Sequence, residues 1–372
     1  MSEYQFYEFR SIDRPLTTEE QQAIGQWSSR TYPTATGATF IYSHGDFPKD
    51  PKQVVGQYFD AMFYIASWGT TQLMFRFPKA LLNRQAIELY CSVEEISLVE
   101  HGTYAILEMQ ASDEEGYGWI DGEGVLSSLI GLRQNILNGD YRSLYLTWLQ
   151  ACSQYREQPE FDEELREPPL SRHLTPLNDA LKSWVEVLHL DQDILAAASA
   201  RQAGVTEKPS QDMAALLALL PETEKDQFLQ SVLNEEPLLS VKLRNRLHEL
   251  SVPSKEAATN SSCRTIANIF QEADQINRQR REIEQRKYEE QQRQKLLQIE
   301  VDEITLWKLV DQHISEKKPK DYDAAVTILK DLLLLAKHRG TQADYEQRIQ
   351  NILQEYPRLS SLKSKIITAG LL

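Results

Sequence analysis

Residues 61–77 read AMFYIASWGTTQLMFRF and contain two apolar runs separated by a turn. The runs Met62–Ile65 and Leu73–Phe75 are rich in aromatic and other large apolar side chains, which favour strands. Trp68–Thr71 lies between them, and Gly69 supplies the permissive backbone that a tight turn needs. The stretch therefore predicts an antiparallel β-hairpin.

Further strands are predicted on both sides of this hairpin, over 4–12, 38–43, 96–99 and 104–110. Thr17 and Glu20 match a capping box, which predicts the start of a helix over 18–30. Helices over 124–137 and 141–155 follow the last strand. Because strands cluster early and helices late, residues 1–156 are predicted to form an α+β domain, with a mostly antiparallel sheet of about five or six strands.

The remaining chain carries no strand signal and is predicted to be all helical. Residues 157–169 combine prolines with a run of carboxylates, a composition that resists packing. The predicted division after the α+β domain is an acidic, proline-containing linker over 157–173, a helical domain over 174–250, a linker over 251–263, a long charged helix over 264–296 and a small helical bundle over 297–372.

The net charge of −15 is unevenly distributed. Residues 1–250 hold 20 Lys/Arg against 37 Asp/Glu, a net −17, whereas residues 251–372 hold 20 against 18, a net +2. An acidic region repels phosphate backbones and anionic membrane surfaces. Nucleic-acid binding is therefore disfavoured for the acidic part and would have to come from the last third of the chain.

The cysteines indicate a reducing compartment. Cys91, Cys152 and Cys263 are far apart, odd in number and without metal-ligand spacing, so they predict reduced thiols rather than a disulfide framework. The N-terminal residues have neither the basic region nor the apolar region of a signal peptide. The most apolar stretch, Met213–Leu220, is far shorter than the ~20 residues that span a bilayer. A cytoplasmic protein without a membrane segment is expected.

The long helix carries an incomplete heptad pattern. With Ile269 at position d, the a and d rows are apolar at the two ends of the helix, whereas between Arg280 and Gln294 the a row is polar and the d row holds Ile283 and then Glu290. A stable coiled coil needs both rows filled over three or four heptads. The middle instead carries acid-first pairs at i,i+4, such as Glu282 with Arg286, which support a solvated helix. Two interpretations remain open: a solvated spacer and a weak homodimer seam.

Two patterns in the α+β domain suggest small-ligand chemistry. His44, Asp46 and Asp60 could together bind a divalent metal or relay a proton. A glycine cluster over 116–124 precedes a helix, as phosphate-binding loops do, but it is surrounded by carboxylates that would repel a phosphate. An enzyme or a small-ligand or metal-binding domain that uses these acidic groups is therefore one alternative function.

Two other patterns suggest nucleic-acid binding. Aromatic residues are abundant in the predicted sheet, but only Arg10 and Arg76 alternate with them, so they are interpreted as core rather than as a stacking platform. The segment Arg278–Lys295 holds seven cations against four carboxylates, a small excess along one helix. An accessory role beside nucleic acid is a second alternative, and it depends on this segment.

The C-terminal bundle offers the candidate partner surface. Trp307 stands near the end of the first helix of the bundle, Tyr322 and Leu329 recur at helix-face spacing in the next, and Tyr345 begins a third. These four residues are predicted to contact a protein partner.

Two resemblances to known families accompany these patterns. The stretches 12–16, 58–78 and 220–226 resemble a family of uncharacterised bacterial proteins, whose shared motifs imply structure and no activity. The tail segments Lys318–Val326 and Leu329–Leu332 are similar to the tails of bacterial SWIM-type zinc-finger proteins. The Cys-x-Cys and Cys-x-His zinc ligands of that family are absent here, so the resemblance implies a shared docking module and no zinc.

The sequence is thus interpreted as a non-enzymatic interaction or scaffold protein. It is expected to need no cofactor, to bind protein partners and to use the long helix as a spacer before a C-terminal docking module.

Overall fold

The computed structural model describes residues 4–112, 122–170, 172–200, 213–234, 236, 238–251 and 264–371. The chain forms two compact units, Met1–Asn277 (unit 1) and Arg278–Leu372 (unit 2). Unit 1 contains two hydrophobic clusters, one on each face of its sheet, and unit 2 contains one of its own.

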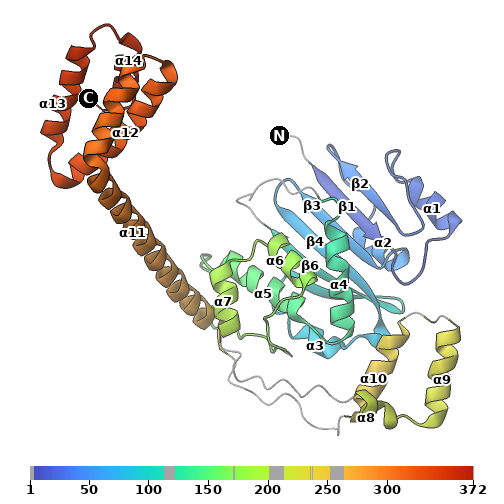
Figure 1. Ribbon diagram of the computed structural model, residues 1–372. Helices are drawn as coiled ribbons and strands as arrows, with labels where there is room; N and C mark the ends of the chain where they lie inside the picture. The colour runs from blue at the N-terminus through green and yellow to red at the C-terminus, as the bar shows by residue number, and fades with distance from the viewer. Residues whose placement is uncertain are drawn as a thin grey trace. The chain divides into compact units, whose positions relative to one another are not determined.

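Unit 1 is built on a six-stranded sheet in the order β2-β1-β3-β4-β6-β5, in which every neighbouring pair is antiparallel (Figure 1). The predicted α+β fold and the hairpin are confirmed, since Met62 lies opposite Met74. The strands are β1 (Gln5–Arg10), β2 (Gly37–Tyr42), β3 (Ala61–Ala66), β4 (Thr70–Pro78), β5 (Ile96–His101) and β6 (Tyr104–Ser112).

Helices cover both faces of this sheet (Figure 1). Successive strand residues point to opposite faces, so Met74 packs toward α1 (Thr18–Gly25) and α2 (Pro51–Gln57), whereas Phe75 packs toward α4 (Val125–Leu137) and α5 (Arg142–Tyr155). The capping box is present, because Glu20 N–H donates to the Thr17 hydroxyl. α1 ends at Gly25, before the predicted residue 30, since glycine and the following serines are weak helix formers.

Short helices complete unit 1. A 3-10 turn (Lys79–Leu81) and α3 (Arg84–Glu88) connect the middle of the sheet to β5. The helices after α5 are α6 (Asp179–Val187), α7 (Gln192–Ala200), α8 (Met213–Ala218), α9 (Glu222–Leu233) and α10 (Leu239–Ser251). Of these, α6 and α7 contribute Trp184 and Ala197 to the core on the α4 face.

The long helix α11 (Ile266–Ser315) passes from unit 1 into unit 2 without a break. It extends past the predicted end at residue 296 because its sequence contains no Pro or Gly that would interrupt it. In unit 2 its second half packs with α12 (Pro319–Arg339), α13 (Gln342–Glu355) and α14 (Ser360–Thr368). None of the helices in the described ranges is long and apolar enough to cross a membrane.

The beginning of α11 belongs to unit 1, so the boundary between the units at Asn277 falls inside the predicted helix 264–296. Ile266 and Ile269 are buried in the core of unit 1. Just before them, Arg264 donates to the Glu167 carboxylate at 2.6 Å. Residues of the segment predicted as an acidic linker therefore hold the start of the long helix.

Candidate functional site

The three predicted metal candidates do not meet. His44 and Asp46 are exposed in the loop after β2, whereas Asp60 is completely buried at the start of β3. Asp46 accepts a hydrogen bond from the Gln5 amide at 2.9 Å, and Gln5 in turn accepts one from the Tyr7 hydroxyl. Within the described ranges, no three His, Cys, Asp or Glu side chains are grouped so that they could hold a metal ion.

Asp60 is instead the centre of a buried ion-pair network. One of its oxygens accepts from Arg76 Nη2 at 2.7 Å and from Nε at 3.2 Å. The other oxygen accepts from the backbone N–H groups of Ile12 and Asp13 at 2.7 and 2.9 Å. A carboxylate that already accepts four hydrogen bonds and has no exposed surface is not accessible to a substrate or a metal ion.

A second arginine extends the network across the sheet. Arg133 of α4 forms two hydrogen bonds with the Asp13 carboxylate, at 2.9 and 2.7 Å, and donates to the carbonyl oxygen of Arg76 at 3.0 Å. The two arginines thus fix the loop after β1 to both sides of the sheet. Sequence reasoning missed this network, although a lone Arg inside the apolar run of β4 signals a buried partner.

The two described cysteines are poor nucleophiles. Cys152 is buried in α5, and Cys91 is half-buried. Burial raises the pKa of both thiols, and nearby Glu95 adds to this effect for Cys152 while Glu88 adds to it for Cys91. The reactive species is the thiolate, so neither side chain is prepared for covalent catalysis. Cys263 lies outside the described residues.

The glycine cluster falls partly outside the described residues, which resume at Gly122. A Cβ at Gly122 would lie 2.4 Å from the ring of Phe6, so only glycine fits against this strand residue. Gly124 has a φ of 81° and stands before the first residue of α4. Close packing at Gly122 and the positive φ at Gly124 therefore explain why glycine occupies these two positions.

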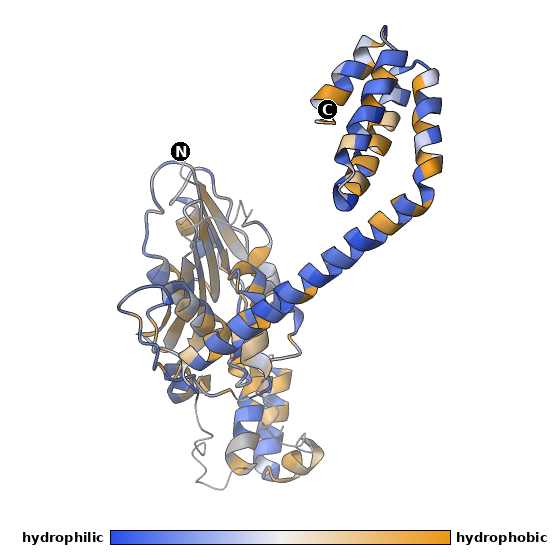
Figure 2. Ribbon diagram, turned by 90° about the vertical axis from the view of Figure 1, so that its left-hand side faces the viewer, coloured by the Kyte–Doolittle hydropathy of each residue, from blue (hydrophilic) through white to orange (hydrophobic). Residues whose placement is uncertain are grey.

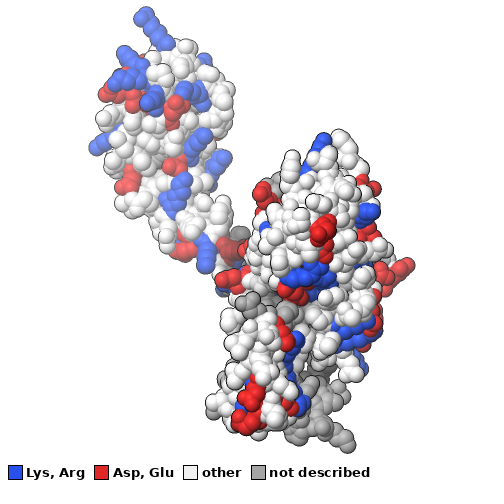
Figure 3. Space-filling model, turned by 90° about the vertical axis from the view of Figure 1, so that its right-hand side faces the viewer, with Lys and Arg blue, Asp and Glu red and all other residues white. Residues whose placement is uncertain are grey.

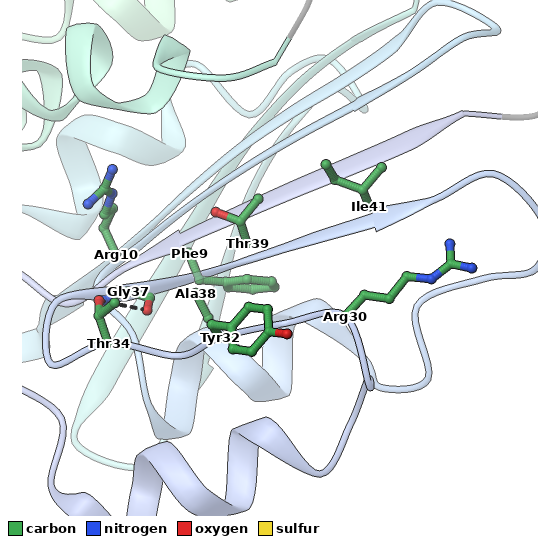
Figure 4. A pocket seen from close by; sticks show the side chains of 9 residues that line it. All are labelled: Phe9, Arg10, Arg30, Tyr32, Thr34, Gly37, Ala38, Thr39 and Ile41. Carbon is green, nitrogen blue, oxygen red and sulfur yellow. Dashed lines mark hydrogen bonds between the residues drawn. The ribbon is translucent and has the colours of Figure 1, made fainter.

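An open groove lies at the edge of β2 in unit 1 (Figure 4). Its volume is about 570 Å³, which is within the range of small-ligand and peptide-side-chain pockets. The lining residues come from β1, from β2 and from the segment that leads into β2, and they are Phe9, Arg10, Arg30, Tyr32, Thr34, Gly37, Ala38, Thr39 and Ile41. We call this site the β2-edge groove.

The edge of β2 is partly covered by its own chain. The Thr31 hydroxyl donates to the carbonyl of Thr39, and the Thr34 N–H donates to the carbonyl of Gly37, both at 2.8 Å. These bonds occupy outward-facing backbone groups that an added strand would need. Addition of a strand along this part of β2 is therefore opposed, which leaves the side chains of the groove as the main surface for a ligand.

The side chains of the groove are cationic, aromatic and apolar. Tyr32 is 86% exposed and Ile41 is 48% exposed, so both present large surfaces to solvent. Arg10 is paired with Glu8 at 2.6 Å, whereas Arg30 has no ion pair within the described ranges. Because isolated exposed apolar residues are common, the informative feature is that Tyr32 and Ile41 line the same groove as the Arg30 guanidinium.

The predicted partner residues of unit 2 lie in its core. Trp307, Tyr322, Leu329 and Tyr345 are all buried. The Tyr345 hydroxyl donates to the carbonyl of Leu329 at 3.0 Å, and the Arg348 guanidinium lies 4.0 Å from the centre of the Trp307 ring. These contacts account for the four residues as a packed core, so a partner would have to contact other residues of the bundle.

The exposed surface of α11 is strongly polar in its middle (Figure 2). Every residue from 278 to 291 is exposed. The cations of the segment Arg278–Lys295 are interspersed with carboxylates, and on the face shown in Figure 3 charges of both signs are mixed across each unit. A single-sign surface of the kind that binds nucleic acid is not seen on that face.

Comparison with known proteins adds little. No protein-family model and no solved structure matches the chain. A cobyric acid synthase of Synechococcus sp. (strain RCC307) is 32% identical over 130 residues, which cover 33% of this chain and 25% of that enzyme. The chain thus matches about a quarter of the length of this relative, and the likeness defines neither a family nor an activity.

Proposed function

We propose that this chain is an interaction protein that acts by binding other proteins rather than by catalysis. In this proposal, unit 1 binds an acidic segment of a partner in the β2-edge groove, and unit 2 serves as a docking module. The exposed stretch of α11 is the spacer before that module, and α11 also supports weak self-association.

The observation that carries this proposal is the pattern of burial along α11. Its first turns are buried in the core of unit 1, and its last turns are buried in the core of unit 2. Residues 278–291, in between, are all exposed and extend for about 20 Å at ~1.5 Å per residue. Apart from Ile283 and Tyr288, which are 53% and 58% exposed, this stretch is polar and contributes little packing, so connection and reach are its best explanation.

The charge of the groove supports the choice of an acidic ligand. Unit 1 is strongly acidic overall, yet the groove presents the guanidinium of Arg30, which has no ion pair among the described residues, beside the exposed ring of Tyr32. Arg and Tyr are enriched where proteins bind one another, because they combine hydrogen bonding with a large contact area. The docking role of unit 2 rests on the predicted resemblance of its tail to the tails of SWIM-type zinc-finger proteins.

The test is affinity capture from the native cell with three forms of the protein: the full chain, a chain ending at Asn277, and the full chain carrying Arg30→Glu and Tyr32→Ala. Ending the chain at Asn277 keeps Ile266 and Ile269, which the core of unit 1 needs. A partner lost from the groove variant is assigned to unit 1, and one lost on truncation is assigned to unit 2.

Each captured protein is then purified and titrated by calorimetry against the full chain. Lys49→Glu is the matched control, because Lys49 is exposed and makes the same charge change outside the groove. The groove substitutions should weaken binding roughly tenfold or more, while the control should leave it unchanged. Identical affinities for all three full-length forms would show that the groove is not the binding site.

A further inference from the structure

The second half of α11 has two apolar faces, of which unit 2 covers one. Ile299 and Val310 are buried against the bundle. Leu297, Val301 and Ile304 are instead 52%, 81% and 73% exposed. Val301 is two residues from Ile299, a rotation of about 200°, so these side chains point to opposite sides of the helix. The exposed face therefore has no cover within the described part of unit 2.

The exposed face continues as a row of heptad positions. The spacing of three and four residues that joins Leu297, Val301 and Ile304 extends in both directions to polar residues that are also exposed. We call this row the α11 seam, and its members are Lys287, Glu290, Gln294, Leu297, Val301, Ile304, Lys308 and Asp311. Its four charged residues have no ion pair within the described ranges.

A parallel pairing of two seams is electrostatically poor. In register, each residue meets its own copy, so Lys287 faces Lys287, Glu290 faces Glu290 and Lys308 faces Lys308. Like charges at these positions oppose association, and they do so at both ends of the apolar segment. The seam therefore does not suit a parallel homodimer.

An antiparallel pairing of the same residues is complementary. If Leu297 of one copy lies opposite Val301 of the second, the heptad spacing places Gln294 opposite Ile304, Glu290 opposite Lys308 and Lys287 opposite Asp311. A twofold axis repeats each pair, because a residue that contacts another in one direction is contacted by it in return. All charged positions then meet the opposite sign.

The residues beside the seam do not oppose this arrangement. On one side they are uncharged, and they are Gln291, Gln298, Thr305 and Gln312. On the other side they are Arg286, Arg293, Glu300 and Trp307. Glu300 is already paired with Arg339 at 2.8 Å, Trp307 is buried, and the inferred register places Arg293 near Trp307 rather than near another cation. Gln294 is the one uncharged polar residue of the seam, and such a residue fixes the register at a cost in stability.

We infer that two copies of this chain associate through the α11 seam as an antiparallel two-helix coiled coil, with Leu297 opposite Val301 and Glu290 opposite Lys308. This inference rests on the self-association included in the proposed function and adds the surface, the orientation and the register. Three apolar residues per copy are few for a coiled coil, so the dimer is weak and its fraction rises with protein concentration.

The test is sedimentation velocity of the full chain at increasing concentration and low ionic strength, where exposed charges are least screened. Wild-type protein should form a dimer, and Val301→Glu should abolish it. Lys308→Glu should weaken the dimer roughly tenfold, because Glu290 then faces a carboxylate at both ends. Adding Glu290→Lys to Lys308→Glu should restore wild-type affinity, since each pair regains opposite signs.

Lys363→Glu is the matched control, because Lys363 is exposed in α14, away from the seam, and the variant should dimerise like wild type. A parallel dimer gives another pattern, because each residue then faces its own copy and every charge variant keeps like charges opposite each other. Lys308→Glu alone would have no effect on such a dimer, and that result would show that the inferred orientation is wrong. A dimer that survives Val301→Glu would place the interface elsewhere. Wild-type protein that stays monomeric would exclude self-association, while partner capture tests the rest of the proposed function separately.

Discussion

The first turns of α11 and its second half share one heptad pattern but differ in burial. Ile266, Ile269 and Ala273 are buried in the core of unit 1. Leu297 and Ile304, which occupy the same heptad position as Ile269, are largely exposed. In unit 1 other parts of the unit cover the apolar stripe, whereas in unit 2 the bundle packs on the other side of the helix. Apolar spacing therefore defines a face that can be buried, and the rest of the fold decides whether it is.

Charged residues show the same contrast. Arg264, just before α11, is buried, pairs with Glu167 and also donates to the carbonyls of Ala197 and Ala198. Arg339, in unit 2, makes ion pairs on the surface. A buried pair cannot lose one member without leaving an uncompensated charge, whereas an exposed pair is replaced by water. The same residue type should thus have very different effects on stability in the two units.

The largest expected effect is therefore that of Arg264→Ala. Removing this guanidinium leaves the Glu167 carboxylate without its main partner and should lower the free energy of unfolding of unit 1 by about 3–5 kcal/mol. Arg339→Ala, the matched control, should cost about 1 kcal/mol or less. Urea unfolding of the full chain, followed by circular dichroism, measures both. Equal losses for the two variants would contradict the contrast between the units.

A pair of isoleucines tests the contrast in apolar contacts. Ile269→Ala removes a fully buried side chain and should destabilise unit 1 by about 2–5 kcal/mol. Ile304→Ala changes the same residue type at the same heptad position, but its side chain is 73% exposed. Its effect on the unfolding free energy should stay within about 0.5 kcal/mol. A large loss for Ile304→Ala, measured at concentrations where the chain is monomeric, would mean that this face is covered within one copy.

The fold could be predicted where local patterns are strong. The hairpin around Gly69 and the capping box at Thr17 are short-range signals, and both are present in the structure. The order of the six strands could not be predicted, because it depends on contacts between residues that are far apart in sequence. Residue 296, the predicted end of the long helix, lies inside α11, because no Pro or Gly follows it before the helix ends at Ser315.

The candidate sites were harder to predict than the fold. Asp60 looked like a ligand beside His44 because the sequence does not show that Arg76 and the N–H groups after β1 converge on it. Trp307 looked like a surface anchor because the bundle that buries it is formed by three later helices. Tyr32 of the β2-edge groove carries no sequence signal, since an exposed tyrosine in a loop has no pattern until its surroundings are known.

The smallest expected effect concerns an exposed ion pair of unit 1, which should behave like those of unit 2. Glu20 pairs with Arg14 at 2.6 Å and accepts from the Thr17 N–H, and hydrogen bonding to Arg14 lowers the pKa of Glu20 from 4.5 to about 2. A carboxyl whose pKa is lower in the folded state stabilises the fold above its unfolded pKa. That contribution is lost as the pH falls from about 4.5 toward about 2.

Glu20→Gln should therefore cost about 1 kcal/mol or less at neutral pH, because the pair is exposed and screened by solvent. The difference from wild type should shrink as the pH falls through this window and vanish near its lower end. Thermal unfolding from neutral pH to the acid limit measures it, with Glu19→Gln, an exposed neighbour outside the capping box, as the control. A difference that stayed constant down to the acid limit would assign the effect to the lost cap geometry rather than to the charge of Glu20.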